Sequence, residues 1–449
     1  MSIFKSYDIR GIYNEEWNKE LAYRIGFFLP SLLKADEILI GRDSRESSDE
    51  IFSYLSQGIM AAGGNVCDIG LCCTPAVYFA TSFYNLGGSV MITASHNPAQ
   101  YNGLKISARE SIPVGYGSGL EKLEKFALSS TPATPVAHRG SLRSLDIRKS
   151  YIAHLAPYKK GIGAIKAVID CSDGMAGVFI HDVIRDLPGE IITMYDTPDG
   201  TFPHHEPNPL DEKNLSSLKI RTLAEKADLG ICFDGDADRV MFIDEKGNFI
   251  SPDLITALLG IYFFKYSGSK ENLGSAVTYD VRSSRSVVEF IDSLGGKPVI
   301  CRVGHSHAKK LLRETRGIFG GELAGHYYFR DNFFCDSAMI AALIILNILT
   351  KEGVSISQLM AGISRYHFSG ELNFTVNDKD RIISSISKDY RHGQLTTIDG
   401  IRIDFPTWWF SLRKSNTEPY LRLVVESESG AELKRTTNEL TEKIKLYDS

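Results

Sequence analysis

The amino-acid sequence predicts an α/β protein with three related mixed-sheet domains, followed by a fourth domain of the α+β class. Two observations support this prediction. First, an apolar β-run, a polar loop and a helix-like stretch recur three times in the same order, which is typical of βαβ units. Second, after about residue 365 this pattern gives way to closely spaced strands and one amphipathic helix. We therefore expect domains at residues 1–146, 147–248, 249–365 and 366–449.

In each of the first three domains an apolar run enters a loop rich in Asp, Ser and Arg, at residues 38–45, 167–174 and 276–285. The helix-like stretch that follows runs to a glycine signal, where a helix C-terminus is expected, and a second β-run comes next. The glycines are Gly63, Gly64, Gly189, Gly295 and Gly296, and the second runs are residues 65–69, 190–195 and 297–303.

A third β-run in each domain opens into an unusual loop. The loops read Ala94-Ser-His-Asn-Pro98, Asp234-Gly-Asp-Ala-Asp-Arg239 and Glu322-Leu-Ala-Gly-His326. In open α/β sheets, ligands bind beyond the carboxyl ends of the strands. We therefore expect the three loops, one per domain, to converge on one cleft.

The fourth domain is expected to contain strands at residues 370–376, 397–405, 408–412 and 420–426, followed by a helix at 431–446. The longest apolar stretches of the chain, residues 254–264 and 338–349, are too short for the ~20 residues that span a bilayer, so we expect buried helices there. The N-terminus lacks the basic and apolar regions of a signal peptide, and we expect a cytoplasmic protein without a membrane partner.

The composition indicates an ordinary soluble globular protein, with 43% hydrophobic and 23% charged residues. It excludes collagen, low-complexity disorder and a small disulfide scaffold. The net charge of −5 over 449 residues gives no broad basic field, so nucleic acid is not expected as a partner. The seven cysteines form no C-x-x-C pair, and we expect reduced core thiols. They are Cys67, Cys72, Cys73, Cys171, Cys232, Cys301 and Cys335.

Asp234, Asp236 and Asp238 alternate on one loop between two apolar runs. Crowded carboxylates repel one another unless a cation neutralises them, and oxygen ligands favour Mg²⁺ or Ca²⁺. A solvated acidic turn is the plainer alternative. An EF-hand fails, because Arg239 occupies the position at which that loop needs glycine, and strands rather than helices flank it.

Two further loops have residues suited to phosphate chemistry. Ser95 and His96 follow a buried strand, with Lys105 close behind, and a serine beside Mg²⁺ and cations can carry a phosphoryl group. A simple turn or cap is the alternative for Ser95. The segment from Arg413 to Pro419 combines hydroxyls, an amide and an arginine, which suits either a phosphate cradle or a polar hairpin.

Four motifs then occur in the order found in α-D-phosphohexomutases: Thr93-Ala-Ser-His-Asn-Pro98, Asp234-Gly-Asp-Ala-Asp-Arg239, Gly321-Glu-Leu-Ala-Gly-His326 and Arg413-Lys-Ser-Asn-Thr-Glu-Pro419. The chain resembles this family over essentially its whole length, and most closely its bacterial phosphomannomutase/phosphoglucomutase branch. The resemblance implies a fourth domain like the TATA-box-binding protein fold and four domains around a central cleft. It implies reversible phosphoryl transfer between positions 1 and 6 of mannose and glucose phosphates.

The resemblance also implies roles. Ser95 would be phosphorylated and would complete a Mg²⁺ site with Asp234, Asp236 and Asp238. The reaction would pass through glucose 1,6-bisphosphate or mannose 1,6-bisphosphate. The implied catalytic residues are Ser95, His96, Lys105, Arg10, Arg239 and His326. The implied substrate-binding residues are Tyr7, Arg282, Gly304, His305, Glu322, Ala324, Arg413, Ser415, Asn416 and Thr417.

One departure from the family pattern concerns the sugar. The family's loop commonly reads Gly-Glu-Met-Ser-Gly-His, whereas Leu323 and Ala324 stand here, and Ala324 lacks a hydroxyl. Selectivity between epimers needs only ~1–3 kcal/mol, so the preferred hexose stays open. The alternatives are a phosphoglucosamine mutase, a Mg²⁺-dependent phosphatase acting through Ser95, and a non-catalytic sugar-phosphate sensor. We expect a monomer or a weak homodimer.

Overall fold

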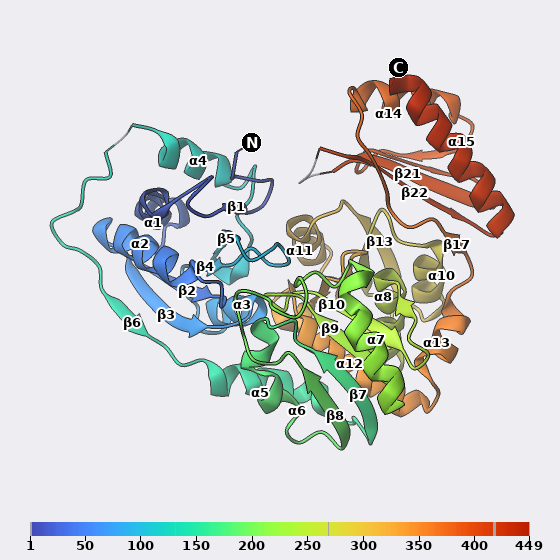
Figure 1. Cartoon of the computed structure of the whole chain (residues 1–449), viewed down its shortest axis with the longest axis horizontal. Coiled ribbons are helices and arrows are strands. Elements are labelled where there is room, and N and C mark those ends of the chain that lie inside the picture. Colours follow the sequence, from blue (N-terminus) through green and yellow to red (C-terminus); the bar gives the residue numbers. More distant parts are fainter. Residues whose placement is uncertain (1, 131, 268, 416–418, 449) are drawn as a thin grey trace.

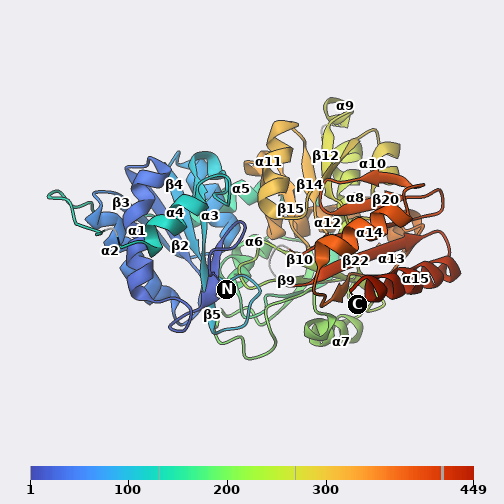
Figure 2. The ribbon, with the colours of Figure 1, turned by 90° about the horizontal axis from the view of Figure 1, so that it is seen from above.

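The computed structural model describes residues 2–130, 132–267, 269–415 and 419–448. Four β-sheets follow one another along the chain, one for each predicted domain, and helices pack against them (Figure 1). We name these parts domains I to IV. Figure 2 shows domain IV, with α15 (Gly430–Asp448), at the opposite end of the molecule from α1 (Lys19–Leu33) and α2 (Ser48–Ala61) of domain I.

Domain I has a six-stranded sheet in the order β1-β5-β4-β2-β3-β6. Strands β2, β3, β4 and β6 run parallel, whereas β5 is antiparallel to both β4 and β1. The strands are β1 (Ile9–Ile12), β2 (Glu37–Arg42), β3 (Asn65–Leu71), β4 (Gly88–Ile92), β5 (Tyr101–Ala108) and β6 (Leu142–Ser144). The remaining α-helices are α3 (Thr74–Phe83) and α4 (Leu120–Leu128).

Domains II and III have five-stranded sheets in the orders β11-β10-β9-β7-β8 and β13-β12-β14-β15-β16. In domain II these are β7 (Ile165–Asp170), β8 (Gly189–Met194), β9 (Leu229–Phe233), β10 (Val240–Asp244) and β11 (Phe249–Ile250), with α5 (Arg148–Lys159), α6 (Ile180–Ile184) and α7 (Ser216–Glu225). In domain III they are β12 (Ala276–Asp280), β13 (Lys297–Cys301), β14 (Phe319–Gly321), β15 (Tyr327–Phe329) and β16 (Cys335–Asp336). The domain III helices are α8 (Pro252–Ile261), α9 (Ser269–Asn272), α10 (Arg285–Ser293), α11 (His305–Glu314), α12 (Ala338–Glu352) and α13 (Ile356–Ile363).

The threefold repeat predicted from the sequence is present in the sheets. The orders β5-β4-β2-β3, β10-β9-β7-β8 and β15-β14-β12-β13 are the same, with the first strand of each set antiparallel to the second. Each expected loop lies between these two antiparallel strands. The three loops therefore occupy the same place in three copies of one sheet, and the sheet fixes both ends of each loop.

Domain IV is an antiparallel sheet with helices on one face. Side chains of α14 (Lys379–Asp389) and α15 pack on the sheet to form a separate core, which includes Ile386, Phe410 and Leu440. The strands are β17 (His367–Phe368), β18 (Leu372–Phe374), β19 (Gln394–Thr396), β20 (Ile401–Asp404), β21 (Trp408–Lys414) and β22 (Leu421–Ser427). On the opposite face, Arg402 stacks on Trp409 and donates to the Val281 and Ser283 carbonyls of domain III.

Two element predictions for domains II and IV need correction. The strand expected at residues 397–405 begins only at Ile401, because Gly400 has a φ of 66° and turns the chain between β19 and β20. The helix expected after residue 174 is short, since a 3₁₀ turn over Met175–Val178 precedes α6. By contrast, the two apolar stretches form largely buried helices, as expected. Residues 254–264 lie in α8 and the π-helical turn Tyr262–Tyr266 that follows it, and residues 338–349 lie in α12.

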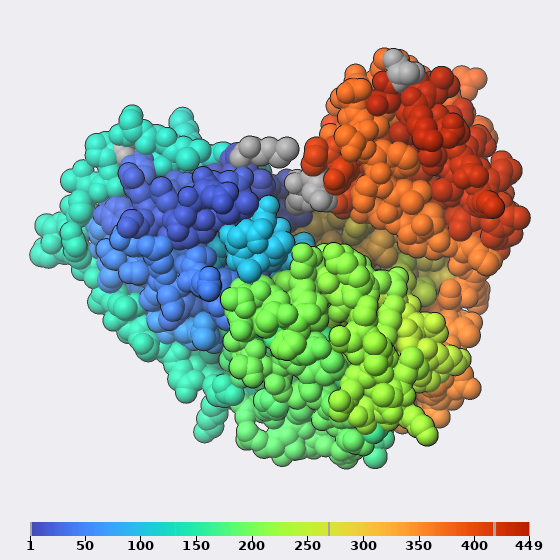
Figure 3. Space-filling model, viewed as in Figure 1, coloured from blue at the N-terminus to red at the C-terminus, as the bar shows by residue number. Residues whose placement is uncertain are grey.

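Domains I, II and III share one continuous hydrophobic core, to which each contributes large side chains such as Phe79, Tyr151 and Phe319. All seven cysteines are buried and free of disulfide bonds. On the face shown in Figure 3, the surface is hollowed between domain I and domain IV. Within the described residues no single helix has the length and apolar character to cross a membrane; α12 and α13, bent by 93°, meet the criteria only as a pair.

Candidate functional site

Ser95 lies where the loops of domains I and II touch. Its side chain is buried, and its Oγ donates to Asp234 Oδ2 across 3.0 Å. The backbone of Ser95 has a φ of 54°, a conformation that a non-glycine residue adopts only at a cost, and its N–H donates to Thr93 Oγ1. A side chain at Gly235 would lie 2.6 Å from the Ser95 carbonyl oxygen, so glycine is needed there for the two loops to meet.

The three aspartates of the second loop are all buried. Asp234 Oδ1 accepts the backbone N–H groups of Asp238 and Arg239 at 3.2 and 3.1 Å, which fixes the loop. Burial, and then the charges of Asp236 and Asp238, raise the pKa of Asp234 well above its usual range. Carboxylates held this close repel one another, so binding of a cation would lower the electrostatic energy of the loop.

Lys105 of β5 supplies a cation to this loop. Its Nζ lies 2.5 Å from Asp236 Oδ2 and also bonds to Asp238 Oδ2. Burial alone would lower the pKa of Lys105, but the attraction of Asp236 and Asp238 outweighs it and raises the pKa well above the usual range. Thr74, at the start of α3, donates to the same oxygen of Asp236. Lys105 therefore pairs with the acidic loop as a cation.

Arg10 and His96 stand beside Ser95. Arg10 pairs with Asp8 at 2.5 Å and donates to Asn97 Oδ1 at 2.7 Å, which ties β1 to the serine loop. His96 Nδ1 lies 3.4 Å from Ser95 Oγ. Burial, and then the positive charges of Arg239 and Arg10, hold the pKa of His96 well below its usual range. The imidazole is thus neutral at pH 7.

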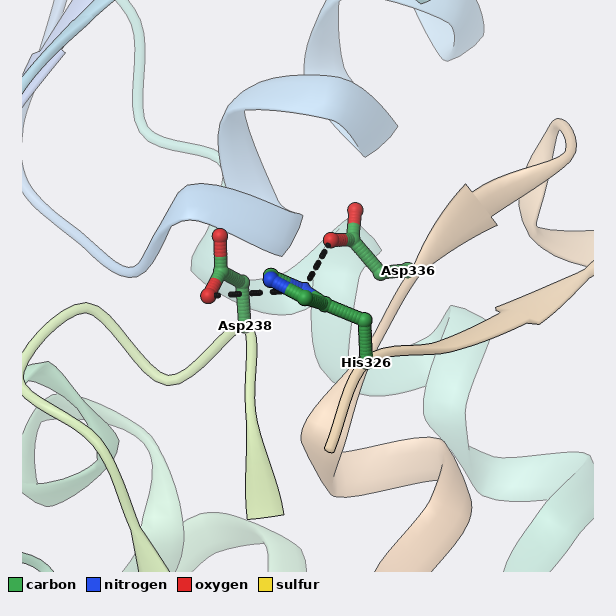
Figure 4. Close-up of side chains that lie close together, drawn as sticks. All are labelled: Asp238, His326 and Asp336. Carbon is green, nitrogen blue, oxygen red and sulfur yellow. Dashed lines mark hydrogen bonds and ion pairs between the residues drawn. The ribbon is translucent and has the colours of Figure 1, made fainter. Parts of the chain in front are cut away.

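The loops of domains II and III meet through Arg239 and His326. Arg239 Nε lies 3.0 Å from His326 Nε2, and the two residues form an isolated antiparallel bridge. On its other side, His326 Nδ1 lies 2.8 Å from Asp336 Oδ2 and 3.7 Å from Asp238 Oδ1 (Figure 4). Asp336 in turn pairs with the fully buried Lys309 at 2.8 Å. These contacts with Arg239 and Asp336 fix the ring of His326 between domains II and III.

Glu322 and His305 stand close to this ring. Glu322 Oε2 accepts the Gly304 N–H at 3.0 Å, and Tyr328 donates to its other oxygen. Gly304 has a φ of 125°, which only glycine adopts readily, and is the N-cap residue directly before α11. Burial raises the pKa of Glu322, although His326 opposes the shift. The ring of His305 contacts Tyr7 of domain I edge-on, with centroids 4.8 Å apart.

The fourth expected loop is described only in part. Arg413 lies near the end of β21, and its side chain is buried. Ser415 donates its N–H to the Tyr420 carbonyl. Arg282, two residues after the end of β12, approaches Arg413 through a shared contact with Glu371. Asn416 and Thr417, which we also expected here, lie outside the described residues. Ala324 is half-buried in the loop after β14.

Several side chains that hold this site were not predicted from the sequence. Arg45 is fully buried and donates to the carbonyls of Ser95, Asn97, Pro98 and Tyr101 at 2.6–2.9 Å, while Asp43 holds it at 3.1 Å. The signal for it was present, because the Asp-x-Arg pair recurs as Asp280 and Arg282 in domain III. Asp336 and Lys309 gave no such signal.

The residues present fit a hard divalent cation. One ligand oxygen from each of Asp234, Asp236 and Asp238 lies within 4.8 Å of the others. Asp236 Oδ1 and Asp238 Oδ1 find no hydrogen-bond partner among the described residues, so two buried oxygens are available. Asp238, His326 and Asp336 form a second group with similar spacing, but Lys309 already neutralises Asp336. The all-oxygen group is the better candidate.

Comparisons with known proteins agree with this architecture. Four families of phosphoglucomutase/phosphomannomutase domains match successive parts of the chain: α/β/α domain I at residues 1–127, domain II at 149–247, domain III at 251–366 and the C-terminal domain at 371–443. A protein of Xanthomonas campestris named for phosphohexose mutases is 37% identical over 443 residues, which are 96% of each chain. The chain belongs to the phosphoglucomutase/phosphomannomutase family.

Other members of the phosphoglucomutase/phosphomannomutase family extend this agreement. A phosphomannomutase of Escherichia coli is 35% identical over 451 residues, covering 98% of both chains. A crystal structure of a family protein from Burkholderia thailandensis superimposes with a TM-score of 0.91 at 29% identity, covering 99% of this chain and 97% of that one. Membership in the phosphoglucomutase/phosphomannomutase family makes this chain a phosphohexomutase, and the four-domain architecture is that of the family. The boundaries that we predicted between the domains stay predictions.

Proposed function

We propose that this phosphohexomutase moves a phosphoryl group reversibly between positions 1 and 6 of mannose and glucose phosphates, with Ser95 as the carrier. One observation supports this most strongly: the Ser95 hydroxyl, buried at the junction of domains I and II, lies 3.0 Å from an acidic loop that Lys105 also contacts. A phosphatase would need the serine and the acidic loop, but it would not need a second phosphate site around Arg413.

In the first half of the reaction, phosphoserine 95 donates to the free hydroxyl of the sugar. The bond from phosphorus to Ser95 Oγ breaks, a bond from phosphorus to the sugar oxygen forms, and the hydroxyl proton leaves to a base. Lys105, Arg10 and Arg239 supply positive charge along the path of the phosphoryl group. Lys105, with Arg10 and His96 near it, would assist proton transfer to and from the sugar hydroxyl, and His326 is a second acid–base candidate.

The product of this half is glucose 1,6-bisphosphate or mannose 1,6-bisphosphate. It turns round and returns its other phosphate to Ser95, which gives the isomeric monophosphate. Asp234, Asp236 and Asp238, with an oxygen at Ser95, would hold Mg²⁺, which supplies a positive charge for the developing negative charge when bound. A trace of bisphosphate would also phosphorylate Ser95 at the outset.

The remaining residues would bind the parts of the substrate that do not react. Arg413, Ser415, Asn416 and Thr417 would hold the phosphate that is not being transferred, with Arg282 beside them. Glu322 would bind ring hydroxyls next to Gly304, His305 and Tyr7. Ala324 offers no hydroxyl to the sugar. We further propose a cytoplasmic enzyme that is a monomer or a weak homodimer, with domain boundaries near residues 146, 248 and 365.

The proposal is tested by ³¹P NMR of the protein with Mg²⁺ and a trace of glucose 1,6-bisphosphate. Mannose 1-phosphate, glucose 1-phosphate and glucosamine 1-phosphate are supplied separately. We expect a 6-phosphate signal to grow with the first two, and Ser95→Ala to abolish it while hexose phosphate still binds. Release of inorganic phosphate alone would make the protein a phosphatase. Turnover by Ser95→Ala would refute the role of Ser95.

A further inference from the structure

Glu371, in the segment before β18 of domain IV, is surrounded by three arginines. Its Oε1 lies 2.8 Å from Arg422. Its Oε2 lies 3.3 Å from Arg282 of domain III and 3.3 Å from Arg413 of domain IV. A carboxylate and a phosphate present similar oxygens to a guanidinium group. The carboxylate of Glu371 therefore contacts Arg413 and Arg282, the arginines at which the proposed function places a substrate phosphate.

The two oxygens of Glu371 are held unequally. The 2.8 Å contact with Arg422 has the length of a strong charge-assisted bond, whereas the two 3.3 Å contacts are long for such a bond. One oxygen thus anchors the side chain, and the other is shared weakly between two cations. A phosphate that approached Arg413 and Arg282 more closely would displace the weakly held oxygen and leave the anchor in place.

The surroundings make this carboxylate necessary when no phosphate is bound. The side chains of Arg282 and Arg413 are only 7% and 3% exposed. Burial, and then repulsion by Arg282, lower the pKa of Arg413. Burial would raise the pKa of Glu371, but the three arginines outweigh it and keep the group ionised. Asp280 binds Arg282 at 2.7 Å, so Arg282 keeps a partner if Glu371 moves.

Arg413 has fewer acidic partners than Arg282. Within the described part of the chain, Glu371 is the one carboxylate at ion-pair distance from Arg413, whose other contact is the Lys414 carbonyl at 3.3 Å. Removal of the Glu371 charge would leave Arg413 buried beside Arg282 and available for an incoming anion. Asp399 would remain as a negative charge nearby. An anion would then bind more tightly than it does in the natural protein.

We propose that Glu371 is a built-in competitor of the substrate phosphate, which keeps phosphate binding at Arg413 and Arg282 weak enough to be reversed in each half-reaction. The inference rests on the proposed function, because it assumes that a phosphate binds at these arginines. The bisphosphate must leave this place to turn round. A cluster of arginines without its own carboxylate would hold the bisphosphate longer, and this slower release would reduce the rate of turnover.

The experiment measures the dissociation constant of inorganic phosphate by titration calorimetry on the full chain, together with kcat and KM for glucose 1-phosphate. Glu371→Gln removes the charge and keeps the shape. Glu371→Asp keeps the charge but shortens its reach to Arg282 and Arg413, and provides a second variant if the first does not fold. Glu442→Gln, on the exposed face of α15, is the matched control. Arg413→Lys tests the phosphate site itself.

We expect Glu371→Gln to bind inorganic phosphate about tenfold more tightly, with a lower KM and a lower kcat, and Glu371→Asp to show a smaller change in the same direction. Glu442→Gln should match the natural protein. If Arg413→Lys weakens phosphate binding while both Glu371 variants leave it unchanged or weaker, the inference is wrong and the phosphate site stands. If Arg413→Lys has no effect, the proposed phosphate site fails, and the inference fails with it.

Discussion

Lys105 Nζ lies 2.5 Å from Asp236 Oδ2, and this buried ion pair joins domain I to domain II at the centre of the site. The pair does two things. It neutralises part of an acidic loop whose three carboxylates would otherwise repel one another, and it holds the loop against β5 next to Ser95. Lys105 of domain I thus supplies part of the positive charge that the aspartate loop of domain II needs.

Lys105→Met should therefore destabilise the protein without metal and increase the stabilisation that Mg²⁺ provides. Without the ammonium, the carboxylates repel more strongly, and a divalent ion relieves more of that repulsion. Thermal unfolding with and without Mg²⁺ measures both effects. For a ligand at 100 times its dissociation constant the stabilisation is ~2.7 kcal/mol. Lys310→Met, at an exposed lysine, is the control, and Asp234→Asn should remove the Mg²⁺ effect. An unchanged Mg²⁺ effect in Lys105→Met would contradict the prediction.

Arg45→Lys should lower kcat about 100-fold with little change in KM, because lysine lacks the planar fork that holds four carbonyls around Ser95. The measurement is steady-state kinetics with glucose 1-phosphate, supported by mass spectrometry of phosphorylation at Ser95. Arg42→Lys is the matched control, since Arg42 pairs with Asp49 and Asp68 near the surface. A kcat within a factor of two of the natural value would show that the serine loop holds its shape without Arg45.

Asp336→Asn should destabilise the fold by about 3 kcal/mol, because it leaves the buried Lys309 ammonium without its counter-ion. Lys309→Met should also destabilise. The double variant should cost less than the two single changes together, since neither charge is then left alone. Urea unfolding of the four proteins gives the coupling energy. Additive effects would mean that the two charges do not depend on each other.

His205 gives a pH-dependent contribution to stability. It lies 3.1 Å from Asp170, and although burial lowers its pKa, the bond to Asp170 outweighs burial and raises the pKa above the usual value, with Asp173 adding to the shift. The protonated form therefore favours folding. Its contribution is complete below a pH of about 6.5 and is lost as the pH rises through the raised pKa.

Urea unfolding between pH 6 and pH 8.5 should accordingly show a decline in stability that is smaller in His205→Gln. His138→Gln, at an exposed position, should keep the decline of the natural protein. If His205→Gln and the natural protein lose stability in parallel over this range, the histidine does not contribute in this way.

Much of the site could be predicted because its residues lie in short motifs. The spacing of Asp234, Asp236 and Asp238 is visible in one loop, and the repeated position of the three loops indicated that they would meet. Asp336 could not be found in this way. It reaches His326 only because β15 and β16 form a hairpin in which Tyr328 lies opposite Asp336, and no local pattern specifies that register.

The same distinction applies to the fold. The recurrence of strand, helix and strand in domains I to III could be predicted from the repeat, whereas the order of the strands came from the structure and the ends of short strands depend on single turns such as that at Gly400. Glu371 shows a further difficulty, because one glutamate between two strands has no sequence signal. Its importance comes from arginines that are 89, 42 and 51 positions away in the chain.

The division of the site among the domains determines what a fragment of this protein can do. Ser95 and Lys105 belong to domain I, the aspartate loop to domain II, His326 to domain III and Arg413 to domain IV. A polypeptide cut between α4 and α5 would yield one piece with the serine and another with the carboxylates. Under the proposed function, neither piece alone would hold both the phosphoryl carrier and the carboxylates, and we expect activity only when the two associate through the core that they share. The chain is therefore suited to a split-protein assay, in which turnover reports directly on the joining of two halves.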